Sequence, residues 1–263
     1  MIKGRTTQDI LYSIGGVAIL FSILLIWQLV SVTNILPSTV FPAASTVLAT
    51  LLVQLESGIL TVELEATLIR LLEGYFLAAI IGISVGLVMG SSKTAENAGD
   101  PLIQFLRPMP SAVLIPLAIL YFGLGDFMIV SIVFYACTWP IIINTMDGVR
   151  NIEPIVLDTA KEYGIKNFAR IWKVILPASA PFIFSGLRVS LAVAWVVAIT
   201  AEILSTAATT GLGAAIYLDL NTGALAQIYA TVIMIAVSAY ALNRLFLFVE
   251  SRMIPWHLKS KQR

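Results

Sequence analysis

The chain has 263 residues, of which 59% are hydrophobic and only 12% are charged, and its formal net charge is +1. Soluble domains carry about a quarter of charged residues, so this chain lacks the polar groups that would cover its surface in water. A net charge this small offers no basic surface to nucleic acid. The single cysteine, Cys137, excludes an intrachain disulfide, and with one histidine the chain has no ligand set for a metal. The composition therefore predicts an integral membrane protein.

Six apolar segments are long enough to cross a bilayer as helices, which takes about 20 residues each. The predicted spans are residues 12–32, 66–90, 102–122, 127–146, 181–204 and 226–249. The first could instead be a cleaved signal peptide, because Lys3 and Arg5 precede it. We favour an uncleaved helix, since the run is long for a signal core and no small-x-small site follows it directly. The prediction is an all-α integral membrane fold with six transmembrane helices.

Basic residues lie on one side of this arrangement. Residues 1–11, 91–101, 147–180 and 250–263 hold 2, 1, 5 and 4 of the 16 Lys and Arg residues, whereas the segments predicted on the opposite side hold none. The positive-inside rule therefore predicts cytoplasmic N and C termini. We find no internal repeat, so an inverted-repeat transporter gains no support. We expect one transmembrane permease domain over residues 1–263.

The longest predicted cytoplasmic segment, residues 147–180, has the pattern of two short amphipathic helices. Pro154 suits the first turn of a helix, and Gly164 suits its C-terminal turn. A second helix is expected over residues 167–175, stopping before Pro177. Its apolar side chains at helical spacing are Phe168, Ile171, Trp172 and Ile175. The pattern fits either a hairpin lying on lipid headgroups or an element that docks into a partner.

The same segment resembles the EAA loop of ABC importer permeases, a Glu-Ala-Ala followed at fixed spacing by Gly and Ile-x-Leu-Pro. Asp158, Thr159 and Ala160 take the first three places here, with Asp for Glu and Thr for Ala. Val replaces Ile at the start of the last group. The resemblance implies an ATPase-coupling loop formed by Asp158, Thr159, Ala160, Glu162, Gly164, Val174, Leu176 and Pro177.

Further stretches are similar to permeases of the nitrate, sulfonate, taurine and bicarbonate group. They are residues 107–116, 122–125, 186–188, 201–202, 211–213 and 255–257. The resemblance implies the permease subunit of a type I ABC importer that moves a small, anionic solute of the sulfonate, taurine, nitrate or bicarbonate class. It places the protein in the inner membrane of a bacterium, in contact with lipid.

The resemblance also implies the partners of such a permease. They are a second permease copy, expected as a homodimer rather than a heterodimer, two ATP-binding subunits, and a periplasmic or lipid-anchored solute-binding protein. This chain has no GxxxxGK[ST] phosphate loop. We therefore expect that it is not an enzyme and binds no cofactor itself, and that ATP and Mg²⁺ bind to the partner ATPase.

Several residues within the spans are candidates for the translocation path. The third predicted span contains Pro101, Pro108, Pro110 and Pro116, so it either lines the path or dimer interface or is a kinked packing helix. Charges within spans are functional candidates. The candidate path residues are Arg107, Pro108, Pro110, Arg188 and Glu202. Snorkelling of the two arginines to headgroups, and a structural role of Glu202, are the alternatives.

Other features have simpler interpretations. The second span carries a stripe of Gly82, Gly86 and Gly90 that permits close helix packing. On the same span Arg70 and Glu73, three residues apart, are placed where they could pair with each other, and we interpret them as structural. Residues 205–225 are either a re-entrant loop, a short helix or a flexible connection, and Trp256 with His257 is expected to be an interfacial anchor. The rival function is a gradient-driven secondary transporter or channel that works without an ATPase.

Overall fold

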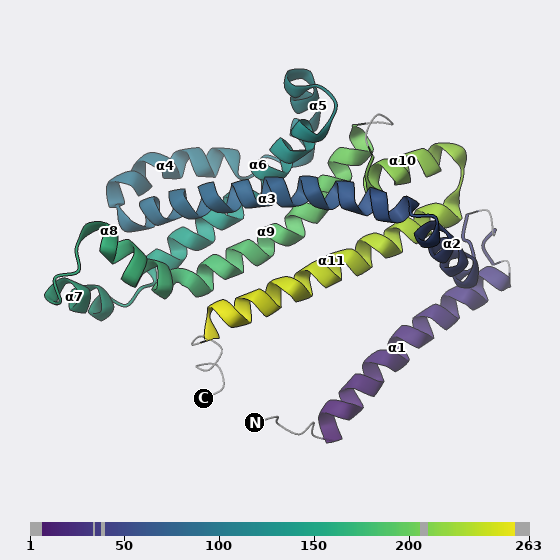
Figure 1. Ribbon diagram of the computed structural model, residues 1–263, viewed down its shortest axis with the longest axis horizontal. Coiled ribbons are helices and arrows are strands. Elements are labelled where there is room, and N and C mark those ends of the chain that lie inside the picture. Colours follow the sequence, from purple (N-terminus) through teal and green to yellow (C-terminus); the bar gives the residue numbers. More distant parts are fainter. Residues whose placement is uncertain (1–6, 34, 38–39, 206–209, 256–263) are drawn as a thin grey trace. The chain divides into compact units, whose positions relative to one another are not determined.

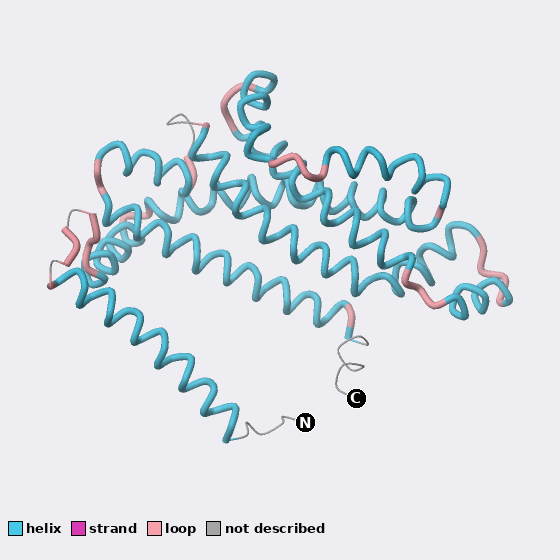
Figure 2. Tube along the Cα trace, turned by 180° about the vertical axis from the view of Figure 1, so that it is seen from behind, coloured by secondary structure: helices cyan, strands magenta, loops and turns pink. Residues whose placement is uncertain are grey.

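The computed structural model describes residues 7–33, 35–37, 40–205 and 210–255, and every regular element within these ranges is a helix (Figure 1, Figure 2). The helices are α1 (Thr7–Val32), α2 (Ala44–Glu56), α3 (Ile59–Ser91), α4 (Lys93–Leu106), α5 (Ser111–Phe122), α6 (Asp126–Arg150), α7 (Pro154–Glu162), α8 (Asn167–Arg170), a π-helical turn (Ile171–Ile175), α9 (Leu176–Leu204), α10 (Leu212–Thr222) and α11 (Leu225–Met253). The all-α prediction is confirmed.

Contacts divide the chain into two compact units, the first formed by residues 1–61 and 218–234. In this unit the chain that follows α1 folds back onto the end of that helix. Trp27 Nε1 donates a hydrogen bond to the Pro42 carbonyl at 3.0 Å, and the Trp27 ring lies 6.0 Å from Phe41 and 5.7 Å from Tyr229. An indole with an apolar ring and one polar atom suits such a position near the end of a span.

Among the described residues, four helical segments are long and apolar enough to cross a membrane, and the number rises to five if α4 and α5 count as one broken span. The four are Ile59–Ser91, Asp126–Arg150, Phe168–Leu204 and Leu225–Met253. They contain the predicted second, fourth, fifth and sixth spans. The predicted first span falls within α1. The count of six spans and the cytoplasmic termini remain predictions.

The predicted third span is not one helix. α4 and α5 meet at an angle of 91°, with residues 107–110 at the bend. Pro110 precedes the first residue of α5 with an extended backbone, φ −64° and ψ 123°. Proline disfavours the helical conformation in the residue before it, which at Pro110 is Met109. Arg107, before Pro108, keeps a helical backbone with φ −55° and ψ −44°. Pro101 and Pro116, by contrast, lie inside α4 and α5.

In the second unit, residues 62–217 and 235–263, α6 packs against both α3 and α9 through glycines. A Cβ atom added to Gly86 of α3 would lie 2.6 Å from Thr145 Cβ of α6, and Gly74, Gly82 and Gly90 approach α6 in the same way. On the other side of α6, a Cβ at Gly186 of α9 would lie 2.7 Å from Asn144 Cβ. The predicted small-residue stripe is therefore a contact at backbone distance.

Candidate functional site

The coupling segment, residues 147–180, contains the helix and glycine turn that the sequence predicts. α7 begins at Pro154 and ends at Glu162. The Ile165 amide donates to the Ala160 carbonyl at 2.9 Å, and the Gly164 amide donates to the Lys161 carbonyl at 3.0 Å. Gly164 has a φ of +71°, in the left-handed region that residues other than glycine rarely adopt. The turn thus closes the helix by a double hydrogen bond around one glycine.

A small apolar core fixes the coupling segment to the ends of α3 and α6. Val149, Ile152 and Ile175 are buried there, and Leu87, Leu157 and Ile171 pack against them. Among the coupling residues Ala160 is buried, Val174 and Leu176 are half-buried, and Asp158, Thr159, Glu162, Gly164 and Pro177 are exposed. The segment therefore has a fixed base and a polar outer face.

The predicted apolar face of the second coupling helix is divided between two environments. Ile171 and Ile175 face the small core, whereas Phe168 is 70% exposed and Trp172 is 57% exposed. The two exposed rings lie 5.8 Å apart and contact each other. A third aromatic side chain, Tyr163 next to the glycine turn, is 80% exposed.

The prediction that the second helix stops before Pro177 is wrong. One helix runs from Phe168 to Leu204. Between α8 and α9 it passes through a π-helical turn, in which the Leu176 amide bonds to the Ile171 carbonyl five residues earlier. A proline ring clashes with the carbonyl four residues before it in a regular α-helix, and the wider turn relieves this clash without ending the helix.

The candidate path residues do not come together in one place. Arg107, Pro108 and Pro110 are exposed at the bend between α4 and α5. The Leu106 carbonyl next to this bend accepts a hydrogen bond from Tyr135 Oη at 2.7 Å, so the bend lies beside the middle of α6. Arg188 forms an ion pair with Glu250 of α11. Glu202 is 14 residues further along α9 than Arg188, about 21 Å at 1.5 Å per residue.

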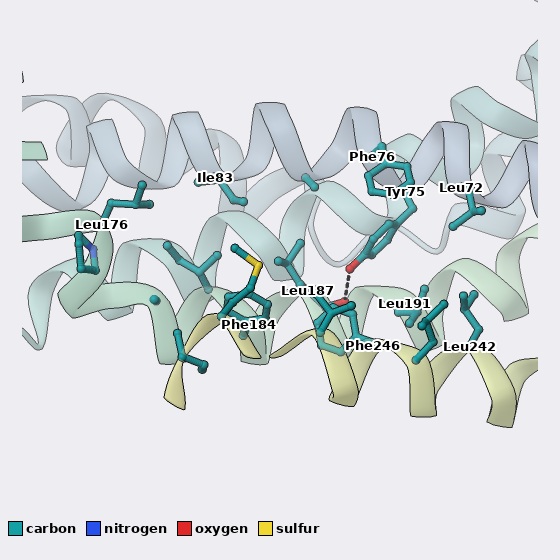
Figure 3. A pocket seen from close by; sticks show the side chains of 18 residues that line it. Leu72, Tyr75, Phe76, Ile83, Leu176, Phe184, Leu187, Leu191, Leu242 and Phe246 are labelled. Atoms are coloured by element: carbon teal, nitrogen blue, oxygen red, sulfur yellow. Dashed lines mark hydrogen bonds between the residues drawn. The ribbon is translucent and has the colours of Figure 1, made fainter. Parts of the chain in front are cut away.

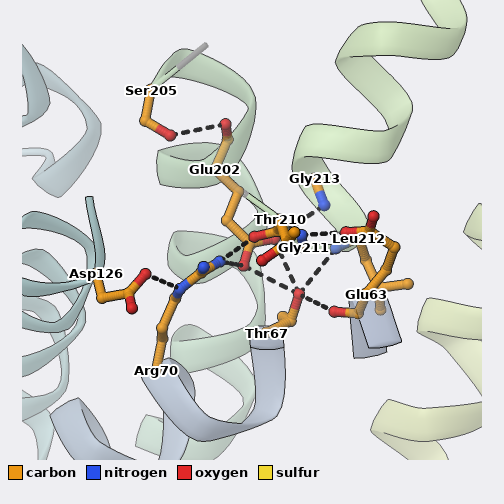
Figure 4. Close-up of polar contacts among 10 residues, drawn as sticks. All are labelled: Glu63, Thr67, Arg70, Asp126, Glu202, Ser205, Thr210, Gly211, Leu212 and Gly213. Carbon is orange, nitrogen blue, oxygen red and sulfur yellow. Dashed lines mark hydrogen bonds and ion pairs between the residues drawn. The ribbon is translucent and has the colours of Figure 1, made fainter. Parts of the chain in front are cut away.

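Glu202 is the buried centre of a polar cluster, the Glu202 cluster, at one end of α3, α6 and α9 (Figure 4). Its members are Glu63, Thr67, Arg70, Asp126, Glu202 and residues 210–213. The Glu202 side chain is fully buried, and Arg70 Nη1 donates to Glu202 Oε1 at 2.9 Å. Thr67 Oγ1 lies 3.0 Å from both carboxylate oxygens of Glu202. The carboxylate thus has a cation and a hydroxyl as partners.

Backbone groups of residues 210–213 complete the cluster. The Gly213 amide donates to Glu202 Oε2 at 2.9 Å, and the Leu212 amide donates to Thr67 Oγ1 at 2.9 Å. The Gly211 amide donates to Glu63 Oε2, and the Thr210 carbonyl accepts from Arg70 Nη1. Residues 210–213, which lead into α10 and form its first residues, are therefore held by side chains of α3 and α9.

Arg70 does not pair with Glu73, because it turns to the cluster and also donates from Nε to Asp126 Oδ1 at 2.7 Å. Glu73 is exposed on α3, beside an open apolar groove. The sequence indicated Glu202 and the Gly211–Gly213 stretch but missed Glu63, Thr67 and Asp126. Their only sequence signal is polarity at the predicted edges of apolar runs.

An apolar cavity of about 590 Å³ lies between α3, α9 and α11 (Figure 3). Its walls are formed by aliphatic and aromatic side chains, among them Leu72, Phe76, Phe184 and Phe246. The hydroxyl of Tyr75, which also lines it, donates to the Leu187 carbonyl at 3.0 Å. A cavity with this lining offers no hydrogen-bonding partner to an anion.

Two predictions concern the end of the chain and the segment before α11. Residues 212–222 form the short helix α10, one of the three alternatives for residues 205–225. Trp256 and His257 lie outside the described residues.

The chain matches the family model described as binding-protein-dependent transport system inner membrane component over residues 78–255. It is 30% identical over 256 residues to the taurine transport system permease protein TauC of Escherichia coli K12, covering 95% of this chain and 91% of the relative. It is also 30% identical to the bicarbonate transport system permease protein CmpB of Synechocystis, covering 94% and 90%.

A solved structure, titled a crystal structure of an amino acid ABC transporter with histidines, superimposes with a TM-score of 0.58 and covers 76% of this chain and 94% of its own. At 17% sequence identity this is a similarity of fold. The family model covers more than half of the chain, and the two relatives match almost all of it. The chain belongs to the family of binding-protein-dependent transport system inner membrane components, the permeases of ABC transporters.

Proposed function

We propose that this protein is the membrane-spanning subunit of an ATP-driven importer and that it moves a small anion delivered by a solute-binding protein. Two copies of the chain would form the translocation unit in a bacterial inner membrane. Two ATPase subunits, which bind ATP and Mg²⁺, would dock on the coupling segments. The relatives named for taurine and bicarbonate transport support a small anion as the solute.

The observation that carries the proposal is the geometry of the coupling segment. Its base is fixed to α3 and α6 by a buried core, while α7 and the turn at Gly164 are exposed. The exposed rings of Tyr163, Phe168 and Trp172 are aromatic side chains of the kind that protein interfaces favour. A protruding element with a rigid base suits the transfer of force from a partner.

We propose that the transported anion binds at the bend between α4 and α5 as it crosses the membrane. The bend lies beside the middle of α6, away from both ends of that helix. Arg107 is exposed there, and a cation at this depth is costly unless it serves a purpose. A guanidinium binds oxyanions such as sulfonate, nitrate or bicarbonate through paired hydrogen bonds.

The test is purification of the tagged chain from its native membrane, with the bound proteins identified by mass spectrometry. We expect an ATPase subunit to co-purify with the wild-type chain. A matched variant with Asp158→Ala and Tyr163→Ala, both on the exposed face, should lose the ATPase and still be recovered in the membrane. Uptake of taurine, ethanesulfonate, nitrate and bicarbonate is then measured in proteoliposomes with ATP inside.

Two results would contradict the proposal. One is a chain that is recovered without any ATPase. The other is uptake that proceeds without ATP and follows an ion gradient, as a secondary transporter would require.

A further inference from the structure

A single helix connects the coupling segment to the Glu202 cluster. The helix Phe168–Leu204 has 37 residues, about 55 Å at 1.5 Å per residue. Near its start, Ile171 and Ile175 pack in the core of the coupling segment. In its last turn, Glu202 is the centre of the cluster (Figure 4). The π-helical turn keeps the chain helical, so no loop separates the two ends.

At the far end, three consecutive backbone amides bond to side chains of two helices. The amides of Gly211, Leu212 and Gly213 donate to Glu63, Thr67 and Glu202 respectively. These amides lie at the start of α10, where no carbonyl of the same helix can accept from them, so they need acceptors from outside it. Here the side chains of α3 and α9 hold the segment, and the position of the segment therefore depends on both helices.

The contact between this segment and Glu202 leaves no free space. A Cβ atom at Gly211 would lie 2.4 Å from Glu202 Oε1, and a Cβ at Gly213 would lie 2.5 Å from the Ile199 carbonyl. Glu202 and Arg70 are both buried, so separating them would leave a charge without its partner inside the protein. The close packing of residues 211–213 on Glu202, together with the buried ion pair, therefore opposes any partial separation of this segment from α9.

We propose that the Glu202 cluster is a permanent brace, which keeps the ends of α3 and α9 and residues 210–213 together as one body throughout the transport cycle. Movement of the coupling segment then reaches residues 210–213 through the helix Phe168–Leu204. Any opening at that end of the protein takes place outside the brace. This inference rests on the proposed function, because the ATPase supplies the movement.

Hydrogen–deuterium exchange of the assembled transporter tests the brace. Exchange is measured for the wild-type chain alone, with its ATPase, and with the ATPase trapped by ATP and vanadate. We expect the amides of residues 211–213 to be slow in all three states, because their side-chain acceptors stay in place. The amides of residues 155–166 should slow when the ATPase binds.

A matched pair of variants separates the brace from simple backbone strain. Gly211 has a φ of +144° and Gly125 a φ of +142°, yet nothing lies within 4 Å of a Cβ at Gly125. Both Gly→Ala changes place a side chain at a positive φ, but only Gly211→Ala brings a Cβ against Glu202. We expect at least tenfold faster exchange at residues 211–213 in Gly211→Ala and no change there in Gly125→Ala.

Each contrary result has its own meaning. Faster exchange at residues 211–213 in the trapped state, with residues 155–166 protected by the ATPase, would overturn the brace and leave the importer in place. Wild-type exchange in Gly211→Ala would also overturn the brace. No effect of the ATPase on residues 155–166 would overturn the proposed function, and with it the source of the movement.

Discussion

Arg70 Nη1 donates to Glu202 Oε1 at 2.9 Å, although the two residues are 132 positions apart in the chain. The pair joins α3 to the last turn of α9, and both side chains are buried. A buried ion pair stabilises little compared with a well-packed apolar pair, but breaking it by removing one partner is costly. Replacing either residue alone should therefore destabilise the protein far more than the intact pair stabilises it.

Glu202→Leu should lower the free energy of unfolding by about 3–5 kcal/mol, because Arg70 loses a buried partner and the Gly213 amide loses its acceptor. Glu73→Leu is the matched control, since Glu73 is an exposed carboxylate on the same helix as Arg70. It should change stability by less than about 0.5 kcal/mol. Thermal unfolding of the purified proteins in detergent measures both, and equal effects of the two changes would contradict the buried-pair argument.

Gly86→Ala should destabilise the packing of α3 on α6 by about 1–3 kcal/mol. The new Cβ would lie 2.8 Å from the Ile142 carbonyl, a backbone atom that has no alternative rotamer. Gly99→Ala in α4 is the control, because its Cβ would meet the flexible end of Met89. That change should be neutral or stabilise by up to about 1 kcal/mol through helix propensity. The same unfolding measurement compares them.

Gly164→Val should reduce recovery of the ATPase without preventing folding. The left-handed backbone at this position costs a side chain about 1–2 kcal/mol, and no atom of this chain lies within 4 Å of the new Cβ. Gly164→Asn is the comparison, because asparagine tolerates this conformation. We expect the asparagine variant to retain more ATPase in co-purification than the valine variant. Full recovery with valine would show that the turn does not fit closely into a partner.

Arg107→Gln should raise the KM for anion uptake by roughly tenfold to a hundredfold, the range expected when a hydrogen bond to a charged group is lost. Arg107→Lys keeps the charge without the planar fork and should give an intermediate value. The control is Arg244→Gln, in which an exposed arginine over the ring of Tyr240 is neutralised. Its uptake kinetics should match those of the wild type. An unchanged KM in Arg107→Gln would remove this residue from the path.

The helices were predictable because each one must be apolar over a bilayer's thickness, which is a local property of the sequence. The boundaries of the helices were less predictable than their presence. α3 begins at Ile59, seven residues before the predicted span, and the sequence analysis did not predict α2. α2 is apolar but has only 13 residues, fewer than a span requires, and residues 59–65 include two glutamates, Glu63 and Glu65, that interrupt the apolar run. The break at Pro108 and Pro110 shows the same limit, since prolines indicate a disturbance without giving its angle of 91°.

The partners in the Glu202 cluster could not be predicted from spacing. Glu73, three residues from Arg70, is the local choice, yet the partners of Arg70 are Asp126 and Glu202. Such pairs depend on which helices lie side by side, and one sequence contains no direct sign of that. The turn at Gly164 was predictable because its hydrogen bonds close within six residues.

The π-helical turn at Ile171–Ile175 holds one extra residue within the helix Phe168–Leu204. Each residue of a regular α-helix turns the chain by about 100°, whereas a π-turn is wider and contains one more residue in a single turn. Deleting one residue there would change the π-turn to a regular α-helical turn, in which the Pro177 ring clashes with a carbonyl of the preceding turn. Phe168 would keep its direction about the helix axis, because the wider turn takes up its extra residue without adding a rotation. The extra residue therefore allows a proline inside a continuous helix while the docking surface keeps its direction.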